Sequence, residues 1–446
     1  MLSNARLVLR HWADPQSRYR KIATSFVWIS VFVLIGRLAS AGKEVTIAWR
    51  YGVSETLDAY LFVFNLLNMP VSVWFSVLTV VLVPLVIRMK TEAPDDLPQF
   101  RAEMLGLTLA LGGGLSLLAL LGLPMILRAD WSRLSGNTLV EALKFSEGMA
   151  LLTLFSSLVS LFSVWLFAAG RHKNTAFEVI PAATLSLALL LPTDYLTTPL
   201  VWGTVLGAAL HMGALLAPLR KHEKLPYPSL RLRSPAWRRL WGGMGIMVVN
   251  QVLMSFLGLV DQFVAAGLGV GALSILNYAN RVLGFILTLL AITIGRAMLP
   301  VFSQPDAISG VNANALVLRC ANWMFVMGVG GGIICWIAAP LAIEILLQRG
   351  AFTQDDSREV TLLLRWSLIQ IPFYVYCATI VNYIASQYKY SIILISSCIA
   401  VFVKLSAIAL LASSLNLVSL VLSSVAIHCA SSIYFYFKIK PIKKLI

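Results

Sequence analysis

The chain has 446 residues, of which 59% are hydrophobic and only 12% are charged, and its formal net charge is +15. Soluble globular proteins carry about 25% charged residues, and so few charges could not cover the apolar surface of a water-soluble fold of this length. With a mean hydropathy of +0.82, the composition excludes an ordinary soluble protein and predicts an all-α polytopic membrane protein.

Hydropathy along the chain predicts twelve membrane-spanning helices, because each needs about 20 mostly apolar residues to cross the bilayer core. A basic linker, residues 220–239, divides them into an N-terminal lobe of six helices (23–219) and a C-terminal lobe of six (240–437). Residues 1–22 form a basic N-terminal segment, and residues 438–446 form a basic tail. The predicted spans, in chain order, are 23–42, 58–87, 103–127, 146–169, 174–192, 199–219, 240–267, 275–302, 316–347, 359–386, 390–413 and 415–437.

The positions of the lysines and arginines predict the orientation of these helices. With the N-terminus inside, 23 of them fall in segments facing the cytoplasm and seven in segments facing outward. An excess of lysine and arginine marks the cytoplasmic side of a membrane protein. We therefore expect both termini and the 220–239 linker in the cytoplasm, and we interpret the basic linker as a topology signal rather than a nucleic-acid site.

Short sequence elements recur in the second half of the chain about 217 residues after their first occurrence. The linker lies midway, so each half contains six helices, and an even number gives both halves the same orientation. Two parallel six-helix lobes around a central cavity are a transporter architecture. The matched elements are Gly52-Val53 with Gly269-Val270, Pro84 with Pro300, and Pro124 with Pro340.

Motifs for several kinds of chemistry are missing from the sequence. It has no G-x-x-x-x-G-K-[ST] loop to bind a nucleotide phosphate, and its five histidines form no H-E-x-x-H zinc motif. All five cysteines lie in apolar stretches without a C-x-x-C spacing, which is typical of small hydrophobic side chains rather than of disulfides. We expect no cofactor, no metal and no catalytic residue.

Two sets of short motifs are specific in combination and together cover most of residues 20–440. The first half contains Arg37-Leu38, Lys43-Glu44, Gly52, Leu57-Asp58-Ala59-Tyr60, Asn68 and Pro84. The second half contains Asn277-Tyr278-Ala279-Asn280-Arg281-Val282, Leu299-Pro300 and the heptapeptide LQRGAFT at 347–353. These motifs resemble the MviN/MurJ lipid II flippases of the multidrug/oligosaccharidyl-lipid/polysaccharide exporter superfamily. The resemblance implies two lobes that rock around a central cavity, transport rather than catalysis, and a place in the bacterial inner membrane.

The resemblance implies an undecaprenyl-pyrophosphate-linked glycan as cargo, either lipid II or a polysaccharide repeat unit. Lipid II flippases carry an arginine pair and then a glutamate in the second helix, where this chain has Val71, Ser72 and Ser76. They also have fourteen helices, against twelve expected here, and an aspartate at the position of Asn280. We therefore expect a polysaccharide-pathway member whose partners are the lipid-linked anionic glycan, membrane lipids and other envelope-glycan biosynthesis proteins.

Charged residues within the membrane are functional candidates in their own right, because each costs roughly 2.5–3.5 kcal/mol at the bilayer centre. Six cations lie there against three acids, an excess that favours an anionic ligand such as a pyrophosphate. The cations are Arg37, Lys43, Arg281, Arg296, Arg365 and Lys404, and the acids are Glu44, Asp58 and Asp261. The candidate substrate-binding residues are Arg37, Lys43, Glu44, Asp58, Asp261 and Arg281.

The depth of each charge suggests its environment. We expect Lys404 to reach the headgroups by snorkelling, and Arg296 either snorkels in the same way or lines the cavity. Asp261 and Arg281 each lie ten residues from Gly271, in a short outer turn. They should reach similar depth on adjacent antiparallel helices, and we expect them to form an ion pair.

Three other classes of protein compete with a flippase. A cation-coupled multidrug exporter of the same superfamily would share the architecture, but the cationic excess disfavours cationic drugs. A membrane glycan polymerase or ligase needs catalytic residues in a substantial outer loop, and the longest one expected here, about 128–145, is short. A scaffold without transport activity does not explain the buried charges.

The expected orientation is tested by labelling single cysteines introduced into a variant that lacks the five native ones. Cysteines at 136 and 354 should react with a membrane-impermeant maleimide applied to intact cells, because both positions lie in outer loops. A cysteine at 229 should react only after the membrane is permeabilised. Labelling of 229 in intact cells would contradict the assignment.

Overall fold

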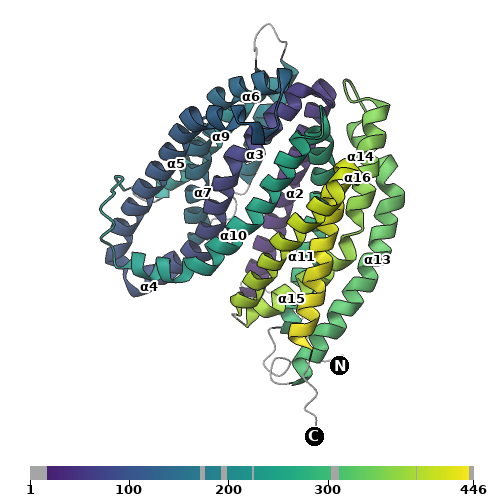
Figure 1. Cartoon of the computed structure of the whole chain (residues 1–446). Coiled ribbons are helices and arrows are strands. Elements are labelled where there is room, and N and C mark those ends of the chain that lie inside the picture. The colour runs from purple at the N-terminus through teal and green to yellow at the C-terminus, as the bar shows by residue number, and fades with distance from the viewer. Residues whose placement is uncertain are drawn as a thin grey trace. The chain divides into compact units, whose positions relative to one another are not determined.

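The computed structural model describes residues 18–170, 176–191, 198–222, 226–302, 311–387 and 389–440, and every regular element in these ranges is a helix (Figure 1). Most of the predicted N-terminal segment, residues 223–225 of the linker and residues 441–446 of the tail lie outside the described residues. The α-helices are α2 (Arg18–Tyr51), α3 (Glu55–Val77), α4 (Val83–Glu92), α5 (Leu97–Arg128), α6 (Gly136–Gly148), α7 (Leu152–Ala168), α8 (Val179–Leu190), α9 (Pro199–His222), α10 (Ala236–Ala266), α11 (Ala272–Phe302), α13 (Val311–Leu347), α14 (Gln354–Leu368), α15 (Ile371–Ser386) and α16 (Tyr390–Ile439). Short elements are the π-helix η1 (Leu78–Leu82) and the 3-10 helices η2 (Pro94–Asp96) and η3 (Asp130–Ser132).

Eight helices in the described part of the chain are long and apolar enough to cross a membrane, or up to ten if each of two bent pairs is one span. The bent pairs are α6 with α7, at 53°, and α14 with α15, at 45°. The predicted span 174–192 corresponds to a short apolar helix, Ala176–Leu190. The polytopic all-α class is confirmed, and the number of twelve spans stays a prediction.

The bent pair α14–α15 begins earlier than the predicted span at 359. Thr353 Oγ1 accepts a hydrogen bond from the Asp356 N–H (3.2 Å), and Asp356 Oδ2 accepts one from the Thr353 N–H (2.8 Å), which makes a capping box. The charged residues of this first turn lower its hydropathy, which is why the predicted span begins later. The same residues stabilise the start of the helix. Pro372, in the first turn of α15, cannot donate a backbone hydrogen bond to α14, so the two helices do not continue as one.

The chain forms two compact units whose boundaries cut across several helices. Unit 1 consists of Met1–Thr46, Leu78–Leu117 and Gly148–Leu240, and unit 2 of Ile47–Val77, Leu118–Glu147 and Trp241–Ile446. Helices α2, α5, α6 and α10 therefore each contribute residues to both units, α6 only through Gly148. Unit 2 combines segments from the first half of the chain with nearly all of the second half. The division into lobes at 23–219 and 240–437 stays a prediction.

In unit 1, the described part of the basic linker is fastened to helix α5 by a buried glutamate. Glu103 is 1% exposed, and its carboxylate accepts hydrogen bonds from the backbone N–H groups of Arg233 (2.9 Å) and Ser234 (3.0 Å) and from Trp237 Nε1 (2.6 Å). The Trp237 ring also packs edge-on against Phe100, with ring centroids 5.4 Å apart. Charge-assisted hydrogen bonds to a carboxylate are strong, so the segment before α10 is held in place.

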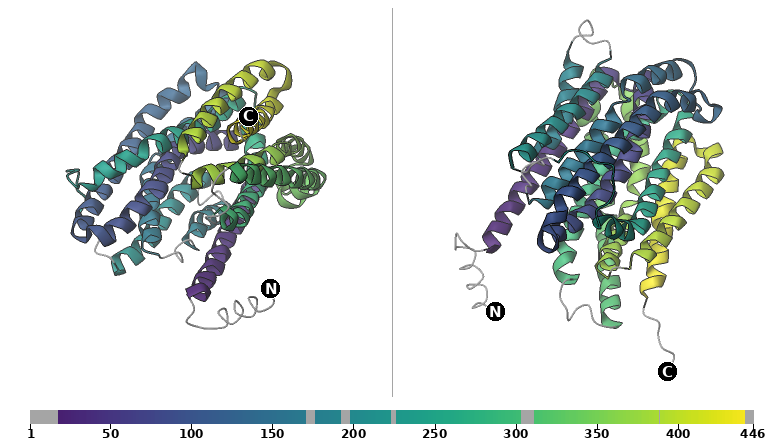
Figure 2. Two further views of the ribbon diagram at one scale, coloured as in Figure 1. Left: turned by 90° about the horizontal axis from the view of Figure 1, so that it is seen from below. Right: turned by 90° about the vertical axis from the view of Figure 1, so that its left-hand side faces the viewer.

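In unit 2, the long helix α16 folds back on itself at Asn416, where the backbone is not helical (φ 44°, ψ −128°). The two arms, residues 390–415 and 417–439, lie antiparallel and side by side, as Figures 1 and 2 show in yellow-green and yellow. Ser396 Oγ on the first arm donates a hydrogen bond to Ser431 Oγ on the second, at 3.2 Å. The arms correspond to the predicted spans 390–413 and 415–437.

Candidate functional site

Asp58, on α3, caps the start of helix α11. Its side chain is 2% exposed, and Oδ2 accepts a hydrogen bond from the Gly271 N–H at 2.6 Å. Oδ1 accepts hydrogen bonds from the N–H and the hydroxyl of Ser274, at 2.7 and 2.5 Å. The first N–H groups of a helix have no partner within the helix, and a negative charge there is favourable. Both oxygens of Asp58 are thus engaged, so this predicted substrate ligand positions α11 in the structure.

A cluster of backbone and aromatic contacts surrounds the end of α2. The Ala351 N–H donates a hydrogen bond to the Trp49 carbonyl (2.8 Å), and Tyr278 Oη donates one to the Gly52 carbonyl (3.0 Å). The Tyr278 ring meets the buried Phe352 ring edge-on, with centroids 5.3 Å apart. Gly52 has φ +53°, and a Cβ there would collide with the Ala351 carbonyl. Only glycine satisfies both requirements.

Together these contacts form the latch, which we define as Trp49, Gly52, Asp58, Tyr278, Ala351 and Phe352, with the α11 residues bound by Asp58. All of them belong to unit 2. Their segments are far apart in sequence, yet all of the six named residues except Trp49 come from motifs singled out by the resemblance. The motifs therefore encode one joint between α2, α3, α11 and the loop before α14. In the predicted topology this joint lies on the outer side of the membrane.

The predicted cationic ligands lie in both units. Arg281 is one turn beyond Tyr278 on α11 in unit 2, and its side chain is exposed. Arg37 is exposed on α2 in unit 1 and interacts electrostatically with Glu178. Lys43 Nζ lies 3.0 Å from Glu44 Oε1, with side chains 18% and 16% exposed, so these two predicted ligands form an ion pair.

The structure gives Asp261 a partner other than the predicted Arg281. Lys404 Nζ lies 2.7 Å from Asp261 Oδ1 and 3.0 Å from Oδ2. The ammonium also donates hydrogen bonds to the Leu420 carbonyl (3.1 Å) and to Ser424 Oγ (2.8 Å). Lys404 is 1% exposed, so the expectation that it snorkels to the headgroups is wrong. One ammonium thus joins α10 to both arms of α16. The side chain of Arg296, the other expected snorkelling cation, lies outside the described residues.

The sequence alone predicted only part of the Asp261–Lys404 ion pair. Counting from Gly271 gave the depth of Asp261, but depth does not say which face of α10 carries the carboxylate. The informative signal was the midspan position of Lys404, because a cation at that depth needs a buried partner. A second polar contact on the same helices, from Ser397 Oγ to Asn250 Oδ1 at 2.5 Å, was also missed. Among the described residues, no group of three or more His, Cys, Asp or Glu could hold a metal.

Solved structures of membrane transporters share this fold. The lipid II flippase MurJ in an inward closed conformation matches with a TM-score of 0.81, covering 93% of this chain and 87% of that one at 17% identity. An inward-facing MATE-family multidrug resistance transporter matches with a TM-score of 0.75, covering 94% of this chain and 99% of that one at 14% identity. The fold is therefore that of a polytopic membrane transporter.

Sequence comparison defines the family within this class. The family model described as lipid II flippase MurJ matches residues 47–446, so the chain belongs to the MurJ family. A lipid II flippase MurJ from Burkholderia cenocepacia is 24% identical over 76% of this chain and 67% of the relative. A probable lipid II flippase MurJ from Buchnera aphidicola is 22% identical over 75% of this chain and 67% of the relative. The resemblance seen in the motifs is confirmed.

The buried ion pair predicts strongly non-additive effects of substitution. Lys404→Met or Asp261→Leu alone should lower the free energy of unfolding by about 3–5 kcal/mol, because each strands a buried charge. The double variant should recover most of this loss, because no unpaired charge remains. The measurement is a double-mutant cycle on thermal unfolding in detergent. As a control, Glu141→Gln breaks an exposed ion pair with Lys144 (3.1 Å) and should cost less than about 1 kcal/mol. Additive losses in the double variant would mean that the two charges do not stabilise each other.

Proposed function

We propose that this protein is a flippase that moves an undecaprenyl-pyrophosphate-linked glycan from the cytoplasmic to the outer leaflet of the inner membrane by alternating access. The observation that carries the proposal is the family match over residues 47–446. The latch supports it, because the family's motifs meet there in one joint. In this proposal both termini are cytoplasmic and no residue is catalytic.

The cationic side chains are the proposed ligands of the pyrophosphate. Arg37 and Arg281 are both exposed, and an arginine can bind two phosphate oxygens at once in a fixed geometry. Lys43 adds a point charge, which Glu44 holds in the absence of substrate. Asp58 and Asp261 act indirectly in this scheme, because one caps α11 and the other binds Lys404. The glycan would follow the headgroup while the lipid tail stays in the bilayer.

The latch is the proposed element that must open for release on the outer side. The five hydrogen bonds described for the latch are few, and four of them involve a backbone group, so they can break and re-form without repacking a large apolar core. Asp58 would lose its N–H partners at that moment, which makes the open state costly unless water replaces them. This cost would favour a closed outer side until substrate is bound.

Two cargoes fit the proposal. The family description and the names of the relatives favour lipid II. The uncharged Val71, Ser72 and Ser76, at positions where lipid II flippases carry charges, favour a polysaccharide repeat unit. Drug export remains the rival function, because MATE transporters share the fold. The excess of membrane cations argues against a cationic drug. Other envelope-glycan biosynthesis proteins are the proposed protein partners.

Substitution of the two arginines tests the proposed ligands. Arg281→Ala and Arg37→Ala should each lower glycan export at least tenfold, because a hydrogen bond between charged groups is worth about 1.5–3 kcal/mol. Arg281→Lys should restore export only in part, because lysine lacks the bidentate geometry. Export is scored by the growth of cells depleted of their own flippase, with membrane protein quantified by immunoblot.

The matched control for these variants is Arg365→Ala. Arg365 is another arginine of unit 2, but it is half-buried, its guanidinium lies 4.3 Å from the centroid of the Trp336 ring, and its Nε donates to the Trp336 carbonyl (3.3 Å). Its loss should leave export near the wild-type level. Normal export by both Arg37→Ala and Arg281→Ala would show that these arginines do not bind the headgroup.

A further inference from the structure

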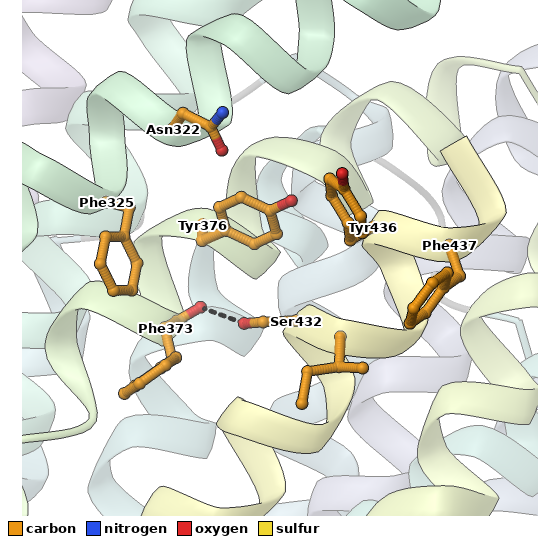
Figure 3. Close-up of a pocket in the computed structure, with 8 residues that line it drawn as sticks. Asn322, Phe325, Phe373, Tyr376, Ser432, Tyr436 and Phe437 are labelled. Atoms are coloured by element: carbon orange, nitrogen blue, oxygen red, sulfur yellow. Dashed lines mark hydrogen bonds between the residues drawn. The ribbon is translucent and has the colours of Figure 1, made fainter. Parts of the chain in front are cut away.

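A pocket of about 460 Å³ lies within unit 2 among helices α13, α15 and α16. Figure 3 shows its lining, in which aromatic rings from all three helices face a common space. The aromatic residues are Phe325 on α13, Phe373 and Tyr376 on α15, and Tyr436 and Phe437 on α16. The volume lies in the range of about 300–1,000 Å³ that is typical of ligand pockets. None of the lining residues is a proposed ligand of the transported substrate.

The residues that line this pocket contact one another through ring packing and a hydrogen bond. The Phe325 ring lies edge-on to the rings of Phe373 and Tyr376, with centroids 5.3 and 6.5 Å away. The Ser432 hydroxyl, on the second arm of α16, shares its one proton between hydrogen bonds to the His428 carbonyl (2.8 Å) and the Phe373 carbonyl (3.4 Å). The second of these bonds is drawn in Figure 3. The pocket is therefore preformed, and a ligand need not order it.

Basic residues lie at one end of the pocket. Lys440 Nζ lies 5.4 Å from the centroid of the Tyr436 ring, which lines the pocket. Lys438, two residues before Lys440, is also exposed. On α13, the exposed Arg319 precedes Asn322 of the lining by three residues, so both lie on one face of that helix. The charge distribution therefore favours a ligand with an anionic head and an apolar body.

The separation between the pocket and Lys440 fits one leaflet of the bilayer. Ser432 in the lining and Lys440 at the end of α16 are eight residues apart, which is about 12 Å along a helix. Half of the hydrocarbon core is about 15 Å thick. Lys438 and Lys440 belong to the segment that the positive-inside rule places at the cytoplasmic surface, where anionic lipids attract basic residues.

We propose that this pocket binds an anionic phospholipid of the cytoplasmic leaflet. One acyl chain lies among the aromatic rings, and Lys440 and Arg319 bind the phosphate. The site is separate from transport, so the lipid is a resident ligand of the protein rather than its cargo. Basic pockets between membrane helices on the cytoplasmic side are known sites for such headgroups.

Native mass spectrometry of the delipidated protein tests this site. With matched acyl chains, phosphatidylglycerol should give at least fivefold more one-lipid adduct than phosphatidylcholine. The double variant Arg319→Gln/Lys440→Gln should lose this preference, because the headgroup loses its charges. Lys389→Gln removes an exposed cation at the start of α16 and should keep it.

A second pair of variants tests the chain-binding part of the pocket. Ile433, which lines the pocket, is 54% exposed, and Ile433→Trp should fill the space and reduce the phosphatidylglycerol adduct at least fivefold. Ile395→Trp, on the first arm of α16 where the side chain is 47% exposed, should not reduce it. Thermal melting of each variant shows that it is folded.

Three results would overturn the proposal. The first is equal binding of the two phospholipids, or a preference that the Arg319/Lys440 variant retains. The second is complete displacement of phosphatidylglycerol by equimolar undecaprenyl phosphate, which would make a prenyl chain the occupant. The third is a lipid-free dimer that Ile433→Trp dissociates, which would make a second copy of the chain the occupant. All three outcomes are independent of whether the protein transports a glycan.

Discussion

A lysine ammonium buried within a membrane-spanning hairpin is the interaction on which unit 2 depends. Lys404 is 1% exposed, and its ammonium is surrounded by the Asp261 carboxylate, the Leu420 carbonyl and the Ser424 hydroxyl. Stranding one member of such a pair is costly, so α10 and both arms of α16 must stay together. Hydrophobic packing alone would not specify this arrangement, because lipid tails are as apolar as the helix surfaces.

The same constraint extends to the turn between α10 and α11. Asp261 lies five residues before the end of α10, and Asp58 binds Gly271 and Ser274 just after the turn. The Phe263 ring, between these points, packs against Phe62 with centroids 5.1 Å apart. Two engaged carboxylates thus hold the turn from both sides. The latch includes residues of α11. The Asp261–Lys404 ion pair on α10 and the Asp58 cap on α11 therefore both stabilise the position of the latch.

Hydropathy predicted most of the described helices because the apolar runs are long and the loops are short and charged. It failed at α14, whose first turn is charged but well capped by Thr353. The motifs pointed to Gly52, Asp58 and Tyr278 individually, whereas their convergence depends on tertiary packing that no local pattern encodes. The Asp261–Arg281 pairing failed for a related reason: equal depth on neighbouring helices does not determine which faces meet. Lys404 was visible in the sequence as a midspan charge, but its partners on the α16 hairpin required the fold.

Translocation of a lipid-linked anionic glycan can be followed with the purified protein in vesicles. Fluorescent lipid II, a fluorescent undecaprenyl-pyrophosphate polysaccharide unit and a cationic dye are each loaded on one side, and the signal reaching a membrane-impermeant quencher on the other side is followed. We expect protein-dependent transfer of at least one of the two glycan lipids, well above that of empty vesicles, and no transfer of the dye. Transfer of the dye without transfer of either glycan lipid would contradict glycan translocation.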